Sequence, residues 1–452
     1  MYNIVSKLII YGNMSKDSIL MELSSIIREY KEAEDTIAAL DDVKQRENKA
    51  IIKNKKDEII TRLYQQVKRI LELATDYGFD DNLWHNYLTY LLITDENPFS
   101  ITCEKVGANE GSVNHFAKND FKQFKALFDY DFSPMENDLG IDCFRQLENY
   151  KAIGKPELMY NKNVSEKVRS LSEKLESAKD EEEFFKCITQ FYKDYGVGMF
   201  GLNKAFRITD ETPFQFKAIN NMDKVTLDDL VGYEIQKKKL IDNTEAFVEG
   251  KKANNCLLFG DSGTGKSTSI KAIVNQYYDK GLRMIEIYKH QFKDLSNVIA
   301  AIKNRNYKFI IYMDDLSFED FEVEYKFLKA VIEGGVETKP ENILIYATSN
   351  RRHLIKENWS DRSDVKVQNG MHQSDTMEEK LSLVNRFGVT INYSKPTQKE
   401  YFEIALQLCR RAGVTLSDEE IKAEANKWEL SHGGISGRTA QQFANYLAGQ
   451  IK

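Results

Sequence analysis

The sequence is poor in the residues that break or cross-link a polypeptide. Its 452 residues include only 6 prolines and 24 glycines, which argues against long disordered tracts. The 5 cysteines are odd in number and far apart, and no CxxC pair occurs. That pattern excludes a disulfide framework and a zinc knuckle, and it fits a reducing compartment.

The sequence also lacks an excess of positive charge and a long hydrophobic run. It has 63 basic and 70 acidic residues, so the formal net charge is −7. A protein that coats nucleic acid usually has the opposite sign, so the bulk charge does not support non-specific DNA binding. The apolar stretch at the start is too short and too broken for a signal peptide, and no later stretch is long enough to cross a membrane. We therefore expect a cytoplasmic protein without a membrane partner.

The residues that are present change in pattern about halfway along the chain. Apolar residues recur at helical spacing from about residue 15 to 205, which predicts an all-α N-terminal region. A turn-rich stretch at 208–232 follows, and beyond it strand and helix patterns alternate. A chain of this length should hold two or three domains. We predict a helical domain over residues 1–210, an α/β domain over 211–394 and a helical lid over 395–452.

The α/β domain contains five strand candidates separated by helical segments, which predicts a mostly parallel sheet. The first, third and fourth candidates are continuous apolar runs, as strands buried on both faces should be. The second and fifth alternate with polar residues and should lie at the edges. Right-handed crossovers then give a five-stranded parallel sheet in the order 5-1-4-3-2. The candidates are residues 256–260, 283–289, 308–315, 342–350 and 387–393.

The string GDSGTGKS, from Gly260 to Ser267, has the pattern of a phosphate-binding loop between a strand and a helix. Glycines let the backbone fold closely around a phosphate, and the loop amides then form an anion nest at the positive end of the helix. Lys266 would reach the β- and γ-phosphates, and Ser267 would bind Mg²⁺. The predicted nucleotide-binding residues of this loop are Asp261, Ser262, Gly263, Thr264, Gly265, Lys266, Ser267 and Thr268.

A second motif, FIIYMDD, ends the third strand on two acids. Ligands bind at the carboxyl ends of the strands in such sheets, so both acids should lie beside the phosphate loop. Asp314 is the candidate for the Mg²⁺ shell, and Asp315 is the candidate that orients or deprotonates the attacking water. Two adjacent acids can also mark a simple turn. Glu319 and Asp320 follow closely and can instead be helix-entry acids.

Three further polar residues are candidates for contacts with the γ-phosphate. At the end of the fourth strand, Asn350 is the first choice and Thr348 the second, although a strand-end asparagine can simply form a turn. Arg386, just before the last strand, falls on the rim, where it can enter the site of a neighbouring subunit. Arg438 opens the last lid helix, where it can couple the nucleotide state to the lid. Each arginine can equally form a surface salt bridge.

From residue 227 onward, the strings LDDLVGYE, GDSGTGKST, YMDDLSFED, NILIYATSN and GISGRTAQQF resemble a bacterial AAA+ ATPase family of unknown function. The resemblance covers the C-terminal half. It implies a P-loop AAA+ core with a C-terminal helical lid, and ATP and Mg²⁺ as cofactors. The roles that it implies are Walker A for Lys266 and Ser267, Walker B for Asp314 and Asp315, sensor 1 for Asn350, the arginine finger for Arg386, sensor 2 for Arg438 and base contacts for Val231 and Gly232.

One position departs from the wider superfamily, which mostly has Asp-Glu where this chain has Asp314 and Asp315. The shorter second acid can sit farther from the water, so hydrolysis can be slow, or Glu319 can assist it.

Two functions remain open at this stage. The first is a Mg²⁺-dependent ATPase that forms a homo-oligomer and remodels or loads an unidentified protein, or less readily a nucleic acid. The alternative is a slowly hydrolysing, ATP-dependent switch or adaptor whose N-terminal helical domain binds a protein partner. A small-molecule kinase fits less well, because no acceptor pocket is evident. A GTPase is disfavoured because LNKAF at 202–206 lacks the acid of a guanine-binding motif. We expect the polar tract 361–380 to be an insertion, which can also contact a partner.

Overall fold

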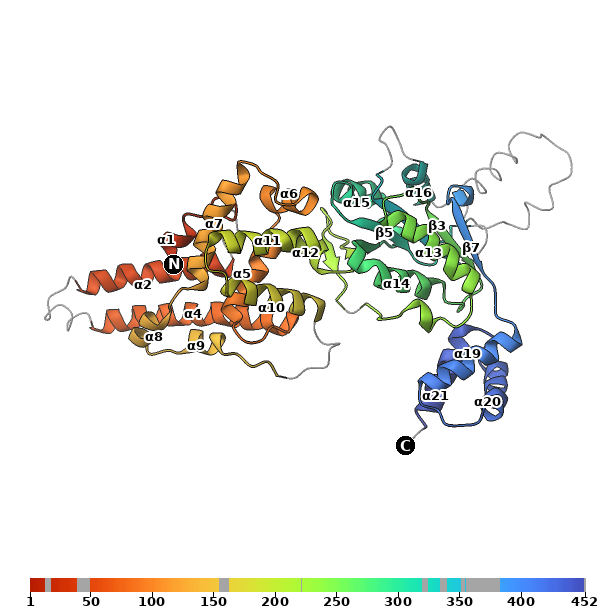
Figure 1. Ribbon diagram of the computed structural model, residues 1–452. Helices are drawn as coiled ribbons and strands as arrows, with labels where there is room; N and C mark the ends of the chain where they lie inside the picture. The colour runs from red at the N-terminus through yellow and green to blue at the C-terminus, as the bar shows by residue number, and fades with distance from the viewer. Residues whose placement is uncertain are drawn as a thin grey trace. The chain divides into compact units, whose positions relative to one another are not determined.

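The computed structural model describes residues 1–12, 18–38, 49–153, 162–220, 222–318, 324–333, 340–350, 354 and 383–450 (Figure 1). The chain divides into two compact units, Met1–Asn203 and Lys204–Lys452. The predictions for Glu319, Asp320 and the tract 361–380 lie outside the described residues. Within the described part of the chain, no helix combines the length and the apolar character that a bilayer crossing requires.

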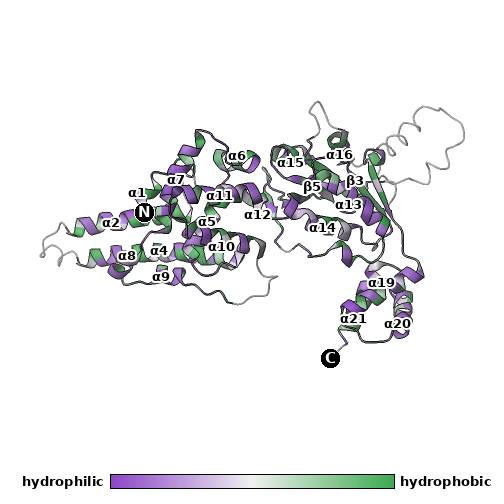
Figure 2. Cartoon of the chain, viewed as in Figure 1, coloured by the Kyte–Doolittle hydropathy of each residue, from purple (hydrophilic) through white to green (hydrophobic). Residues whose placement is uncertain are grey.

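All secondary-structure elements described in the first unit are helices, as the apolar periodicity predicts. In α2 the buried residues Ile19, Leu23, Ile26 and Tyr30 recur at steps of three and four. Figure 2 shows hydrophobic and hydrophilic residues alternating along this helix. The helices enclose one hydrophobic core that is rich in aromatic rings. The helices are α1 Tyr2–Val5, α2 Ile19–Ala38, α4 Lys49–Tyr77, α5 Leu83–Thr94, α6 Pro98–Val106, α7 Val113–Phe128, α8 Ser133–Leu139, α9 Cys143–Glu148, α10 Lys162–Glu176, α11 Glu181–Tyr195 and α12 Gly198–Leu202.

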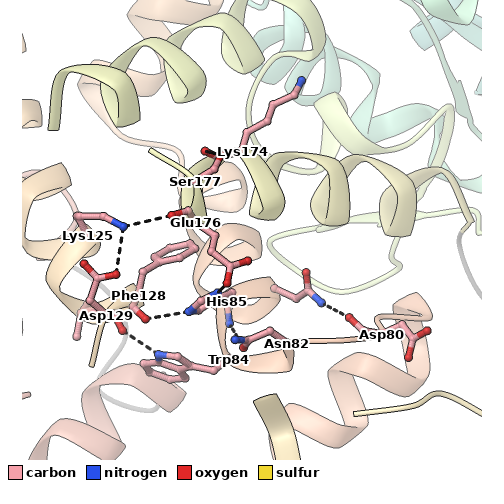
Figure 3. A network of polar contacts seen from close by, with 12 residues as sticks. Asp80, Asn82, Trp84, His85, Lys125, Phe128, Asp129, Lys174, Glu176 and Ser177 are labelled. Carbon is pink, nitrogen blue, oxygen red and sulfur yellow. Dashed lines mark hydrogen bonds and ion pairs between the residues drawn. The ribbon is translucent and has the colours of Figure 1, made fainter. Parts of the chain in front are cut away.

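Side chains of α5 satisfy the carbonyl groups at the end of α7 (Figure 3). Trp84 Nε1 donates a hydrogen bond to the Leu127 carbonyl at 2.9 Å, and His85 Nε2 lies 2.8 Å from the Phe128 carbonyl oxygen. The ammonium of Lys125, also on α7, donates to the last carbonyl of α10 at 3.3 Å. The last carbonyls of a helix have no partner within it, so these contacts supply partners for carbonyls at the ends of α7 and α10 and tie three helices together.

The second unit is built on a sheet of seven strands in the order β2-β1-β4-β5-β6-β3-β7. β2 pairs antiparallel with β1, and all other neighbours are parallel. The five predicted strands keep the mutual order β7-β3-β6-β5-β4, but the prediction of a five-stranded sheet is wrong. The strands are β1 Ala205–Ile208, β2 Phe216–Ala218, β3 Cys256–Gly260, β4 Leu282–Glu286, β5 Lys308–Met313, β6 Ile343–Ser349 and β7 Val389–Tyr393.

The prediction that the second strand, β4, lies at an edge is also wrong, because β1 covers it. Glu286, one of the polar residues on which the edge prediction rests, lies opposite Arg207 of β1. Its Oε2 accepts a hydrogen bond from Arg207 Nε at 2.6 Å, so the polar residue serves strand pairing. β1 and β2 have four and three residues, which is too short for the two-residue period of a strand to stand out.

Helices α13 and α14 pack on one face of the sheet. The core on this face joins Leu240 of α13 and Ile270 of α14 to Leu258, Ile310 and Leu344 of the central strands. The helical elements of this α/β part are η2 Leu227–Asp229, α13 Glu234–Val248, α14 Lys266–Tyr277, η3 Tyr278–Lys280, η4 Lys289–Asp294, α15 Leu295–Ile302 and α16 Glu324–Glu333.

The helical lid that the sequence predicts from residue 395 contains the helices α19 Gln398–Arg411, α20 Asp418–Ser431 and α21 Gly437–Ala448. Each begins at a hydroxyl side chain that accepts a hydrogen bond from a backbone amide of the first turn, which fixes where the helix starts. These capping residues are Thr397, Ser417 and Ser436. The helices share a small core of their own.

Candidate functional site

A cavity of about 530 Å³ opens between the phosphate loop, the ends of β5 and β6, the segment before α13, and lid helices α19 and α21. Most of the predicted site residues line it. These are Val231, Ser262, Gly263, Thr264, Gly265, Lys266, Ser267, Thr268, Asp314, Asp315, Asn350 and Arg438. Gly232, Asp261 and Arg386 are not among its described lining residues.

Two positions at the phosphate loop, Gly260 and Gly265, require glycine because neighbouring atoms lie too close for a Cβ. Gly260 has φ +130°, and a Cβ there would lie 2.2 Å from the Tyr393 carbonyl oxygen at the end of β7. Gly265 has φ +89°, and its Cβ would lie 2.6 Å from a methyl carbon of Leu230. A Cβ would clash at both points, and at Gly265 the bare backbone lines the cavity at the start of α14. The amides of a first helical turn and the positive helix end favour an anion in this position.

Lys266 is held inside the site. Its side chain is only 6 % exposed. Its ammonium donates to the carbonyls of Gly260 and Asp261 at 3.0 and 2.6 Å and to Asn350 Oδ1 at 3.1 Å. Burial lowers the pKa of Lys266, and the nearby carboxylate of Asp315 offsets this only in part.

Asp314 is the centre of the hydrogen-bond network at the strand ends. Its Oδ1 accepts from the hydroxyls of Ser267, Tyr312 and Thr348 at 2.7, 2.7 and 2.6 Å. Burial alone would raise the pKa of Asp314, but the three hydroxyl donors and an amide hold it below its ordinary value. Burial and the neighbouring carboxylate raise the pKa of Tyr312 far above its usual range, so its hydroxyl stays a donor.

Asp315 is turned back toward the cavity by an unusual backbone conformation. Side chains alternate along a strand, so the residue after Asp314 would ordinarily point to the other face. Asp315 instead has φ +48°, in the left-handed region that aspartate tolerates better than most residues. Its amide donates to Thr348 Oγ1 at 2.9 Å, and Asn350 Nδ2 donates to its carboxylate at 2.7 Å. Thus Thr348 and Asn350 together orient the second acid.

The lid touches the phosphate loop directly. The backbone amide of Arg438, at the start of α21, donates to the Gly263 carbonyl at 3.1 Å. A Cβ on Gly437 would lie 3.1 Å from the same oxygen. The Arg438 side chain lines the cavity. The first turn of α21 therefore closes the site beside the loop.

One part of the cavity is apolar. Leu230, Val231, Ile404 and Leu408 line it, and Val231 packs against the core of the lid. Arg411 at the end of α19 donates to the carbonyls of residues 228 and 229 at 2.7 and 3.1 Å. These bonds attach the segment before α13 to the lid, so the two walls of the apolar part are joined.

The three predicted residues outside the cavity lining have other positions. The Asp261 carboxylate accepts a hydrogen bond from the Lys395 amide at 2.9 Å, which ties the loop to the chain after β7. Gly232 is exposed, with φ +80°, next to the lining residue Val231. Arg386 is half-buried just before β7. Its role toward a neighbouring subunit stays a prediction.

Tyr312 was not among the predicted site residues, and Thr348 was only the second choice for the contact with the γ-phosphate. A signal for both exists in the two-residue period of strands. Tyr312 and Asp314 lie on one face of β5, and Thr348 and Asn350 follow Tyr346 on the same face of β6, since Tyr312 pairs with Tyr346. A tyrosine within a buried strand also needs a partner for its hydroxyl, and the acid two residues later supplies one.

The donor set suits a hard divalent cation. The Ser267 hydroxyl and the Asp314 carboxylate are oxygen ligands of the kind that Mg²⁺ takes, and they lie 2.7 Å apart. Among the described residues, no group of three or more His, Cys, Asp or Glu side chains is placed to hold a metal. Few protein ligands are what Mg²⁺ needs when phosphates and water complete its shell.

The family described as "Protein of unknown function (DUF815)" matches residues 202–451 of this chain. The sequence-based resemblance to a family of unknown function is thereby confirmed. No curated protein matches the chain.

Solved structures of RuvB from Thermotoga maritima show a weak similarity. The structure titled a Holliday junction branch migration motor is 18 % identical, with a TM-score of 0.35, and the match covers 50 % of this chain and 64 % of that chain. A point mutant of the same protein is 17 % identical, with a TM-score of 0.35, over 49 % of this chain and 63 % of that chain. This chain thus spans less than two thirds of the RuvB chain, and so weak a likeness says nothing of its activity.

Proposed function

The chain belongs to the DUF815 family, and we propose that it is a Mg²⁺-dependent ATPase of the AAA+ type. The observation that carries the proposal is the convergence of five side chains on one cavity. Lys266 and Ser267 come from the phosphate loop, Asp314 and Asp315 from the end of β5, and Asn350 from the end of β6. Hydrogen bonds of 2.7–3.1 Å already connect these side chains in two groups. Ser267 bonds to Asp314, and Lys266 is linked through Asn350 to Asp315.

The nucleotide phosphates would lie against the loop amides and the start of α14. Lys266 would exchange its contacts with loop carbonyls for the β- and γ-phosphate oxygens. Ser267 would turn its hydroxyl from Asp314 to Mg²⁺, and Asp314 would hold the same ion through its shell. Held by Ser267 and Asp314, Mg²⁺ would neutralise negative charge on the phosphates.

Asp315 would take the proton of the attacking water or orient that water toward the γ-phosphate. Asn350 holds the Asp315 carboxylate at 2.7 Å and also contacts Lys266, so it would connect the residue that orients the water to the residue that binds the γ-phosphate. Arg438 would add positive charge at the γ-phosphate from the lid side. The base would occupy the apolar part, beside Val231 and Leu408.

Substitution of Lys266 tests this proposal. We expect Lys266→Ala to weaken ATP binding by roughly 100-fold and to abolish hydrolysis, because charge-assisted hydrogen bonds to phosphate contribute about 1.5–3 kcal/mol. ATP binding is measured by equilibrium titration with a fluorescent analogue, and hydrolysis by phosphate release. Lys271→Ala is the matched control, since Lys271 lies on the same helix but pairs with Asp223 at 2.7 Å outside the cavity. Equal affinities for the two variants would contradict the proposal.

The alternative, a slowly hydrolysing switch or adaptor, is supported by the second acid. Asp315 is one methylene shorter than the glutamate that most of the superfamily has, and Asn350 already binds its carboxylate. In this alternative the N-terminal helical unit, Met1–Asn203, binds a protein partner. Both forms of the proposal include a homo-oligomer, with Arg386 acting on a neighbouring subunit. They differ in the rate of hydrolysis.

A further inference from the structure

Three hydroxyl groups meet on a single oxygen of Asp314. Ser267, Tyr312 and Thr348 all donate to Oδ1, at 2.6–2.7 Å. A carboxylate oxygen offers about two lone-pair directions, so two donors saturate it. The third donor is in excess, and one of the three bonds is therefore the easiest to exchange.

The three donors differ in how firmly each is held. Tyr312 is 1 % exposed, and its ring belongs to the core between the sheet and α14. Thr348 is 2 % exposed, and its hydroxyl also accepts the Asp315 amide at 2.9 Å. Ser267 opens α14 and lines the cavity. Ser267 can thus leave Asp314 while the two strand residues keep their bonds.

We propose that Tyr312 is a positioning residue for the Mg²⁺ of the site, because its buried hydroxyl holds Asp314 Oδ1 when Ser267 turns to the metal. Because Tyr312 and Thr348 hold Oδ1, the carboxylate keeps one orientation. Its second oxygen would then be placed to contribute to the metal shell. This inference rests on the proposed Mg²⁺–ATP function and assigns a role in it to Tyr312, a residue of the FIIYMDD string that had no predicted role. Groups that orient a metal-binding carboxylate typically change metal affinity when they are removed.

A purely structural role for the hydroxyl makes a different prediction. Tyrosine is buried only when its hydroxyl finds a partner, and Asp314 would then serve Tyr312 rather than the reverse. Loss of the hydroxyl would lower stability and leave the metal dependence unchanged. The two roles are therefore distinguished by Mg²⁺ titration and not by stability or activity alone.

The chain contains a matched control for this test. Tyr346 of β6 is the register partner of Tyr312, is fully buried and belongs to the same core. Its hydroxyl bonds to Thr244 and Asn243 of α13, at 2.8 and 3.0 Å, and not to the site. Tyr346→Phe thus removes an equally buried hydroxyl from the neighbouring strand without touching Asp314.

The experiment measures binding of a fluorescent ATP analogue as a function of Mg²⁺ concentration, together with binding in EDTA. We expect Tyr312→Phe to raise the Mg²⁺ concentration for half-maximal binding by about tenfold, at the low end of the effect of outer-shell partners. Binding in EDTA should stay within about twofold of wild type, and Tyr346→Phe should leave both quantities unchanged. An unshifted Mg²⁺ dependence in Tyr312→Phe, or an equal shift in both variants, would overturn the inference.

A second pair of variants covers poor folding of Tyr312→Phe. Asp314→Asn alone is compared with Asp314→Asn combined with Tyr312→Phe, which removes donor and charged acceptor together and leaves no buried charge without its partner. We expect the same Mg²⁺ dependence in both, because Tyr312 acts through Asp314. A further shift in the double variant would contradict the inference. If wild type binds no nucleotide in the presence of Mg²⁺, the proposed function itself is wrong. If wild type binds nucleotide and Tyr312→Phe has the same Mg²⁺ dependence, only the role of Tyr312 is wrong.

Discussion

Asp314 and Asp315 are adjacent residues whose carboxylates have different surroundings. Asp314 accepts three hydroxyl donors, which lower its pKa and fix one of its oxygens. Asp315 has a left-handed backbone and one amide donor, from Asn350. A saturated carboxylate suits a fixed ligand, whereas a less saturated one can still accept a proton. The environments thus support separate tasks, with Asp314 at the metal and Asp315 at the water.

Thr348 is the residue that joins the two acids. It donates to Asp314 and accepts from the Asp315 amide. We expect Thr348→Val, which keeps the shape but loses both bonds, to reduce ATP turnover roughly 10- to 100-fold through misplacement of the acids. The unfolding free energy should fall by about 1–3 kcal/mol, because a buried amide loses its partner. Steady-state phosphate release and thermal denaturation measure the two effects.

Two variants separate positioning from stability in this prediction. Thr348→Ser restores the hydroxyl and should recover most of the turnover. Thr244→Val removes another fully buried hydroxyl, which bonds to the Leu240 carbonyl and to Tyr346, away from the cavity. It should lower stability without lowering turnover per folded molecule. The positioning role would be wrong if Thr244→Val lost turnover to the same degree as Thr348→Val.

At the scale of elements, α21 and the phosphate loop meet through their backbones. The Arg438 amide donates to the Gly263 carbonyl, and Gly437 allows that approach. We expect Gly437→Ala to weaken ATP binding by about tenfold, because a Cβ 3.1 Å from the Gly263 oxygen must push the lid from the loop, at a typical overpacking cost of about 1 kcal/mol or more. Titration with a fluorescent ATP analogue measures the effect.

The other end of the same helix supplies the control. Gly449 ends α21 with φ −67°, and a Cβ there would meet only ordinary contacts, at 3.4 and 3.6 Å. Gly449→Ala should therefore bind ATP as wild type does. Unchanged affinity in Gly437→Ala would show that the contact between lid and loop does not matter for binding.

Most of the sheet and much of the cavity could be predicted from the sequence, for physical reasons. Strands buried on both faces are continuous apolar runs, which placed β3, β5 and β6 in the centre, and the glycine spacing of the phosphate loop is demanded by close backbone approach. Short strands have no such signal, so β1 and β2 were missed. The prediction that β4 lies at an edge was wrong because a polar residue such as Glu286 can face a residue of a paired strand as well as solvent.

Tyr312 was not predicted because it stands within an apolar run, where a tyrosine is ordinarily interpreted as a core residue. The apolar contacts of Ile404 and Leu408 escaped because they come from the lid, and only the tertiary fold brings that helix to the segment before α13. Ile404 and Leu408 belong to no motif, so their place in the cavity could not be predicted from the sequence.

At the scale of the whole molecule, the proposed homo-oligomer gives Arg386 a role between subunits that can be tested. If Arg386 acts on a neighbouring subunit, a mixture of inactive Arg386→Ala and Lys266→Ala subunits should regain activity, because some interfaces then combine two intact halves. Phosphate release is measured after subunit exchange. Arg410→Ala is the control, since Arg410 is a surface lid arginine paired with Asp418 at 2.6 Å, and it should stay active alone. No recovery in the mixture would contradict action between subunits.

The most direct test of the central claim compares ATP turnover by wild type and by Asp315→Asn at saturating Mg²⁺ and ATP. Asparagine tolerates the left-handed backbone at this position, so fold and ATP affinity should be kept. We predict that Asp315→Asn binds ATP as tightly as wild type and hydrolyses it about 100-fold more slowly or worse, as expected for loss of a general base. A wild type that binds ATP yet turns over no faster than Asp315→Asn would contradict an ATPase and leave the nucleotide-binding adaptor.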